Sequence, residues 1–155
     1  MILVIGYGST LRTDDAIGHV VAHALDERYS ASDVQIITAA QLMPEHAAPI
    51  SRADHVIFID ANAELPVGQV RIAPVAAADS RAALTHHAAP ESPLRSAGLL
   101  YGRRPSAQII SIGAESFAFG LSLSPTLRAQ VPEIVARADA VVDAVLHAPG
   151  GTAAV

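Results

Sequence analysis

Short apolar segments recur along the chain and are separated by longer amphipathic stretches. Apolar runs of about four to eight residues, bounded by turn residues, are typical of strands buried inside a sheet. One segment, residues 68–75, alternates between apolar and polar positions, so we expect it to be more exposed than the others. The predicted strands are residues 2–6, 33–39, 55–61, 68–75 and 107–114.

The stretches between these strands show helical periodicity. At about 100° per residue, apolar positions between Ile17 and Leu25 fall on one face. Gly102 is a typical residue just beyond a helix end, and Ser124 followed by Pro125 is a strong helix start. The predicted helices are residues 15–28, 42–53, 93–102 and 124–148, the second of them short and interrupted by prolines.

Strands that alternate with helices predict an α/β fold, with a largely parallel sheet covered on both sides. We expect a single domain over residues 1–148 and a frayed tail over residues 149–155, because 155 residues suit one domain. The hydrophobic fraction of 51% with only 4% aromatic residues agrees with parallel strands buried on both faces.

Composition excludes several classes of function. The net charge is −5 and no basic stripe is present, which argues against a nucleic-acid partner. The absence of cysteine excludes disulfides, thiolate metal sites and cysteine nucleophiles. The first strand begins at residue 2 and no apolar run reaches membrane-spanning length, so we expect a cytoplasmic protein with no membrane partner.

The turn after the first strand, "GYGSTLRTDDAIG" at residues 6–18, combines glycines with two adjacent carboxylates. A glycine-rich turn before a helix often binds phosphate, but Asp14 and Asp15 would repel an anion, and Leu11 replaces the third glycine of a dinucleotide motif. Aspartate also caps helix N-termini. We therefore expect Asp14 to cap the helix and Asp15 to serve as a functional ligand.

Ionisable residues follow three of the predicted strands. Asp15 follows the first, Asp60 ends the third, and the pair His86-His87 follows the fourth. In open α/β sheets, ligands bind outside the carboxyl ends of the strands. Two carboxylates and one imidazole suit a divalent ion such as nickel, zinc or iron. Adjacent side chains diverge, so we expect only one of the two histidines to take part.

Other candidate sites are weaker. His19 and His23 have the spacing of a zinc-protease helix, but Val20 stands where that motif needs glutamate. Both histidines lie opposite the apolar stripe, so we predict that they occupy a solvated helix face. No serine has a nucleophile-elbow context, and we expect Glu115, after the fifth strand, to cap a turn rather than line the crevice.

Four motifs in order resemble the [NiFe]-hydrogenase maturation proteases, endopeptidases that trim the C-terminus of the hydrogenase large subunit. The opening turn corresponds to the family pattern G-x-G-N-x-L-x-x-D-D/E-G-x-G, and "VIFIDA", "THHAAPESPL" and "GLSLSP" follow at compatible spacing. The resemblance extends from residue 2 to about residue 147. Ser9 and Ala16 depart from the family's asparagine and glycine, which leaves the acidic pair intact.

The resemblance implies a three-layer α/β/α sandwich around a mixed five-stranded sheet. It also implies that Asp15, Asp60 and His87 contact nickel, which belongs to the substrate, the large-subunit precursor. In this interpretation nickel marks a precursor that is ready for cleavage, and zinc could occupy the site in the isolated protein.

The catalytic residues implied in this way are Asp15 and Asp60. Either a shared metal polarises the scissile carbonyl or activates water, or one of these carboxylates acts as a base in an aspartyl-type mechanism without metal. The alternative function is a non-proteolytic metal-binding or chaperone-like protein of the same fold, and a nucleotide-binding protein ranks last. We expect a monomer.

Overall fold

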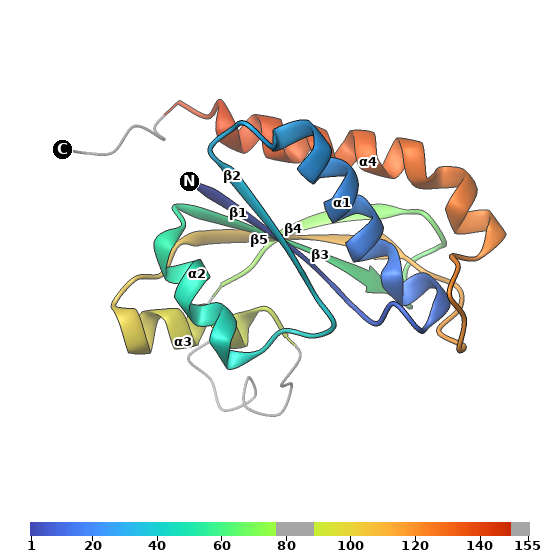
Figure 1. Ribbon diagram of the computed structural model, residues 1–155, viewed down its shortest axis with the longest axis horizontal. Helices are drawn as coiled ribbons and strands as arrows, with labels where there is room; N and C mark the ends of the chain where they lie inside the picture. Colours follow the sequence, from blue (N-terminus) through green and yellow to red (C-terminus); the bar gives the residue numbers. More distant parts are fainter. Residues whose placement is uncertain (77–88, 150–155) are drawn as a thin grey trace.

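The computed structural model describes residues 1–76 and 89–149, and its centre is a five-stranded sheet (Figure 1). The strand order is β2-β1-β3-β5-β4. Four strands run parallel, and β4 at one edge pairs antiparallel with β5. The mixed α/β sheet is therefore confirmed. The strands are β1 Ile2–Tyr7, β2 Val34–Ala39, β3 His55–Asn62, β4 Val70–Pro74 and β5 Ser106–Gly113.

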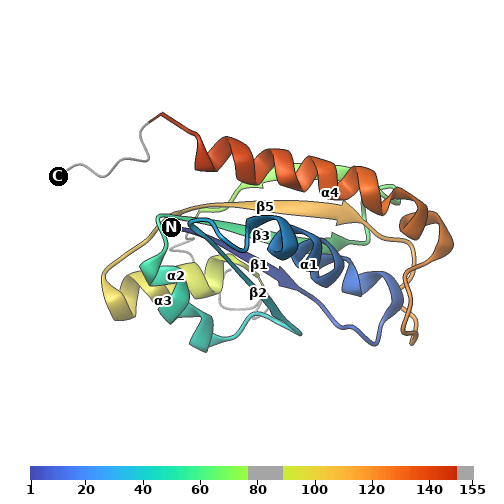
Figure 2. The ribbon, with the colours of Figure 1, turned by 45° about the horizontal axis from the view of Figure 1, so that its top comes forward.

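Helices cover both faces of the sheet. Helices α1 and α4 lie on one face and α2 and α3 on the other, as Figures 1 and 2 show. This arrangement confirms the three-layer α/β/α architecture. Within the described residues, no helix has the length and apolar character needed to cross a membrane. The helices are η1 Thr13–Ala16, α1 Ile17–Tyr29, η2 Pro44–His46, α2 Ala47–Arg52, α3 Glu91–Tyr101 and α4 Pro125–Leu146, where η denotes a 3-10 helix.

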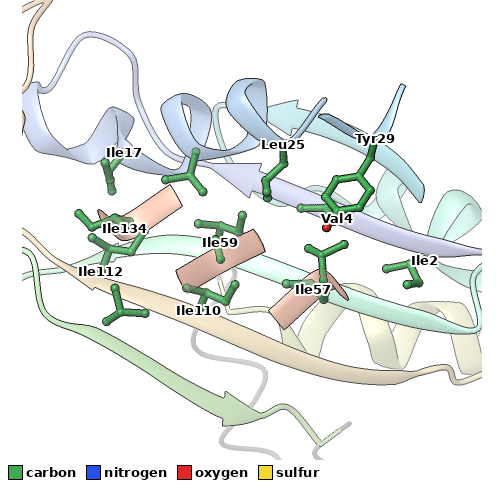
Figure 3. Close-up of a cluster of buried hydrophobic side chains, with 14 of the residues drawn as sticks. Ile2, Val4, Ile17, Leu25, Tyr29, Ile57, Ile59, Ile110, Ile112 and Ile134 are labelled. Carbon is green, nitrogen blue, oxygen red and sulfur yellow. The ribbon is translucent and has the colours of Figure 1, made fainter. Parts of the chain in front are cut away.

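Two hydrophobic cores fill the space between the layers. Alternate residues of a strand point to opposite faces, so Val4 contributes to the core under α1 and α4, whereas Ile5 contributes to the core above α2 and α3. Figure 3 shows the first core, where Leu25 of α1 lies over side chains of β1 and β3. Burial on both faces explains why the central strands read as continuous apolar runs.

Several helix ends agree with expectation. The Ser124 side chain accepts a hydrogen bond from the Leu127 N–H at 3.4 Å, and Pro125 is the first residue of α4. Gly102 closes α3 in the left-handed conformation at φ 69°. The expected helix over residues 15–28 differs at its start, since η1 precedes α1. The expected helix over residues 42–53 is likewise divided into η2 and α2.

The start of α1 packs directly on the carboxyl ends of β1 and β3. A Cβ atom on Gly6 would overlap the carbonyl oxygen of Gly18, and a Cβ atom on Gly18 would lie 2.6 Å from the carbonyl oxygen of Ile59. Both positions therefore need glycine. This close approach brings η1, with its acidic pair, to the edge of the sheet where β3 ends.

Candidate active site

Asp60 and Tyr7 lie side by side at the carboxyl edge of the sheet. Gly6 of β1 pairs with Ile59 of β3, so the next residues along the two parallel strands are also neighbours. Tyr7 is buried on the face covered by α2 and α3, and its hydroxyl lies close enough to the Asp60 carboxyl group to affect the pKa of that group. The sequence motif around Asp15 did not single out Tyr7. The signal that could have identified Tyr7 is its position at the end of β1, the strand next to the one that carries Asp60.

The environment of Asp60 changes its acidity. Burial raises its pKa to about 6, and the negative charge of Asp15 adds to this increase. Hydrogen bonds with the Tyr7 hydroxyl and the backbone of Ala61 act in the opposite direction. Burial, together with Asp60, raises the pKa of Tyr7 far above its usual range. Tyr7 therefore stays protonated, and its hydroxyl is available as a donor to Asp60.

Asp15 is held by the turn that leads into α1. Its Oδ2 atom accepts a hydrogen bond of 2.6 Å from the backbone N–H of Ser9. Gly8 has a φ of 139°, and a Cβ atom there would overlap the carbonyl oxygen of Asp15. Because the contact uses the backbone of residue 9, it does not depend on the side chain at that position. The structure thus brings Asp15 close enough to Asp60 for their charges to interact.

Asp14 has a different role from the one expected. It is fully buried, and its Oδ2 atom accepts hydrogen bonds from the N–H groups of Glu115 and Ser116, both at 3.1 Å. The Ser124 N–H donates to Oδ1 at 2.7 Å, and the Ser124 hydroxyl donates to Oδ2 at 2.9 Å. The expectation that Asp14 caps its own helix was wrong, because these donors belong to the connection between β5 and α4.

The two histidines of α1 behave differently from each other. His23 is exposed, as expected. His19 is not on a solvated face: its Nε2 atom lies 2.7 Å from the Gly8 carbonyl oxygen and 3.1 Å from that of Ala39. Both partners are acceptors, so Nε2 carries a hydrogen. The expectation for His19 was wrong, because this side chain ties the Gly8 turn to the end of β2.

Three further groups complete the account of the ionisable residues: the His86-His87 pair, Glu91 and Glu115. His86 and His87 fall outside the described residues. Glu91, the first residue of α3, is near enough to Tyr7 for its charge to raise the pKa of that tyrosine. The Glu115 side chain is exposed, and only its backbone contacts Asp14. Within residues 1–76 and 89–149, no group of three His, Cys, Asp or Glu side chains could hold a metal ion.

A cavity of about 540 Å³ lies elsewhere in the molecule, between β4, β5 and α4. One of its lining residues, His55, begins β3, whereas Asp60 lies near the end of the same strand. At about 3.3 Å per residue, this separates the cavity from Asp60 by roughly 17 Å along the strand. The carboxylate pair therefore does not belong to this cavity.

Comparison with known proteins begins with the sequence. No family profile matches the chain. A segment of 61 residues is 39% identical to the Hydrogenase 2 maturation protease of Escherichia coli K12. That segment makes up 39% of this chain and spans 37% of the relative's length.

Solved structures match over most of the chain. HybD, a hydrogenase maturating endopeptidase from Escherichia coli, has a TM-score of 0.71 and 26% identity over 93% of both chains. An endopeptidase from Escherichia coli solved in solution has a TM-score of 0.72 and 25% identity over the same shares. The maturation protease HycI from Thermococcus kodakarensis, at 23% identity and a TM-score of 0.70, shares the fold over 92% of both chains. This chain is therefore similar to hydrogenase maturation proteases, in sequence over that segment and in fold over most of its length.

Proposed function

We propose that this chain is an endopeptidase that removes the C-terminal extension of a [NiFe]-hydrogenase large-subunit precursor after nickel insertion. The observation that carries the proposal is the pairing of Asp15 and Asp60 at the carboxyl edge of the sheet, within a fold shared with HybD. A cytoplasmic location and a monomeric state remain predictions.

A pair of neighbouring carboxylates suits a cation. The charge of Asp15 raises the pKa of Asp60 because two nearby anions repel, and a divalent ion between them would relieve that repulsion. Nickel carried by the precursor is the cation of this proposal, with Asp15, Asp60 and His87 as its contacts. Carboxylate and imidazole ligands are compatible with nickel and with zinc. Glu91 lies near the carboxyl edge of the sheet and follows His87 by four residues in sequence. This proximity supports His87 as the third nickel contact.

The chain's own groups suit peptide hydrolysis. Asp60, with a pKa of about 6, is ionised at neutral pH yet basic enough to accept a proton from an attacking water. Tyr7 offers a hydrogen-bond donor beside the Asp60 carboxylate, and the Ser9 N–H orients Asp15. When bound, the metal would supply Lewis-acid polarisation of the scissile carbonyl. Proton transfer by Asp60 alone is the metal-free alternative.

The test uses the purified protein and the large-subunit precursor of its source organism, prepared with and without nickel. We expect mass spectrometry to find a shortened product with the nickel-loaded precursor alone. Equal cutting of both forms would refute nickel gating. Asp60→Ala should leave the loaded precursor uncut. If wild type binds the precursor but never shortens it, the chain is a docking or chaperone-like protein instead.

A further inference from the structure

Large apolar side chains are exposed on two loops at the same edge of the sheet as Asp15 and Asp60. The exposed fractions are 57% for Leu11, 81% for Phe119 and 84% for Leu121. We name these three residues the apolar rim. Leu11 belongs to the connection between β1 and α1, and the other two belong to the connection between β5 and α4. Figures 1 and 2 show the two connections side by side.

Backbone hydrogen bonds join the two loops. The Gly120 N–H donates to the Leu11 carbonyl oxygen at 3.0 Å, and the Thr13 N–H donates to the Gly120 carbonyl oxygen at 3.1 Å. The Thr13 hydroxyl donates to the Ala118 carbonyl oxygen at 2.6 Å. The rim is therefore built on paired backbone segments rather than on two independent loops.

Contacts at the base and at the tip hold the rim in place. Buried Asp14 binds the N–H groups of Ser116 and Ser124, which lie at the two ends of the second loop. At the tip, the Arg12 guanidinium lies 4.6 Å from the centre of the Phe119 ring, a cation–π contact. A surface fixed before binding loses little conformational entropy when a partner docks.

We propose that the apolar rim is the surface on which the protein substrate docks, so that apolar side chains of the precursor pack against Phe119 and Leu121. This inference rests on the proposed function. The rim is continuous with the site, because Leu11 and Asp15 belong to the same turn and Asp14 joins both loops. An aromatic side chain that is exposed and held in position is a common anchor of protein interfaces.

A folded protein is the occupant that fits this position. A second copy of the chain on the rim would lie beside Asp15 and hinder access of substrate to the carboxylates. An anionic membrane surface is disfavoured, because the chain carries a net charge of −5. The precursor, in contrast, can contact the rim and the carboxylates at once. Because both contacts are needed, a folded partner that makes both is favoured over peptides that make only one.

The test compares two double variants. Phe119→Ser with Leu121→Ser alters the rim, and Leu99→Ser with Leu100→Ser is the control. The control residues are 68% and 69% exposed, and they lie near the C-terminal end of α3. This end of the helix points away from the edge of the sheet that carries the rim (Figure 1). With the nickel-loaded precursor of the source organism, we expect the rim variant to raise KM about tenfold, more than any change in kcat. The control should stay within about twofold of wild-type KM.

The outcomes separate this inference from the proposed function. If wild type cuts the precursor and the rim variant keeps its KM, the rim inference fails and the function stands. If wild type does not cut the precursor, the proposed function fails, and titration calorimetry then tests docking on its own. Equal affinity of wild type and rim variant for the same precursor would overturn the rim inference as well. If wild type sediments as a dimer and the rim variant as a monomer, the rim is a self-association surface and the inference is overturned.

Discussion

At the scale of single residues, Tyr7 and Asp60 are neighbouring buried groups in the candidate site. Burial raises the pKa of both groups, so the tyrosine remains a donor while the carboxyl group titrates near physiological pH. A pattern of apolar positions predicts that a strand ends at Asp60. It does not predict that Tyr7 is its partner, because that contact depends on which strand lies next to β3.

Replacing Tyr7 tests this pairing directly. Tyr7→Phe removes a hydrogen bond that lowers the pKa of Asp60, so that pKa should rise above about 6. The pH dependence of the Asp60 carboxyl carbon shift in NMR measures this. Tyr29→Phe is the control, because the Tyr29 hydroxyl binds Asp139 at 2.6 Å, on the other face of the sheet. An unchanged Asp60 pKa in Tyr7→Phe would mean that the hydrogen bond is absent in solution.

The raised pKa of Asp60 also predicts how stability depends on pH. The folded protein holds this proton more tightly than the unfolded chain, whose pKa is near the usual 3.8. Its contribution to stability is therefore complete below about pH 4 and is lost as the pH rises through about 6. Asparagine at position 60 stays uncharged at every pH. The free energy of unfolding of Asp60→Asn should therefore increase relative to that of wild type as the pH rises, by up to roughly 3 kcal/mol at pH 8. Urea unfolding between pH 4 and 8 measures it, and a constant difference would contradict the prediction.

At the scale of helices and strands, local signals were sufficient for most of the fold. Apolar runs predicted four of the strands, and alternation of apolar and polar positions predicted β4. Ser124 and Gly102 marked helix ends because capping depends on neighbours in sequence. Long-range contacts could not be predicted in this way. Asp14 binds donors more than 100 residues away, and His19 binds the end of a neighbouring strand. Nothing in the sequence around either residue reports those partners.

The contacts of Asp14 predict a large effect on stability. Asp14 joins η1 to the start of α4 and receives hydrogen bonds from three backbone N–H groups and one hydroxyl. In Asp14→Asn, an amide NH₂ would face some of these donors. We therefore expect a loss of roughly 2–4 kcal/mol in the free energy of unfolding, measured with denaturant. Asp26→Asn, on the exposed side of α1, is the matched control. If Asp14→Asn were as stable as wild type, the contacts of Asp14 would contribute no more than a helix cap does, since asparagine caps as well as aspartate.

At the scale of the whole molecule, the fold gathers groups from distant segments at one edge. Asp15 comes from the turn after β1, Asp60 from β3, and Glu91 from the start of α3. The apolar rim comes from the connections that flank α1 and α4. The rule that ligands bind at the carboxyl ends of parallel strands predicted where this edge would be. Which apolar side chains would remain exposed beside it could be seen only in three dimensions.

The proposed nickel contacts yield a prediction that separates neighbouring residues. Asp15→Asn removes a charged ligand and His87→Ala an imidazole, so both should weaken nickel binding at least tenfold in titration calorimetry. His86→Ala should change affinity little, because adjacent side chains point in different directions. Lowering the pH from 8 to 6 should weaken nickel binding to wild type, since protons compete for the imidazole and for Asp60. If His86→Ala proves damaging and His87→Ala mild, the histidine assignment is wrong by one residue. If Asp15→Asn also binds nickel as wild type does, this edge of the sheet is not a cation site.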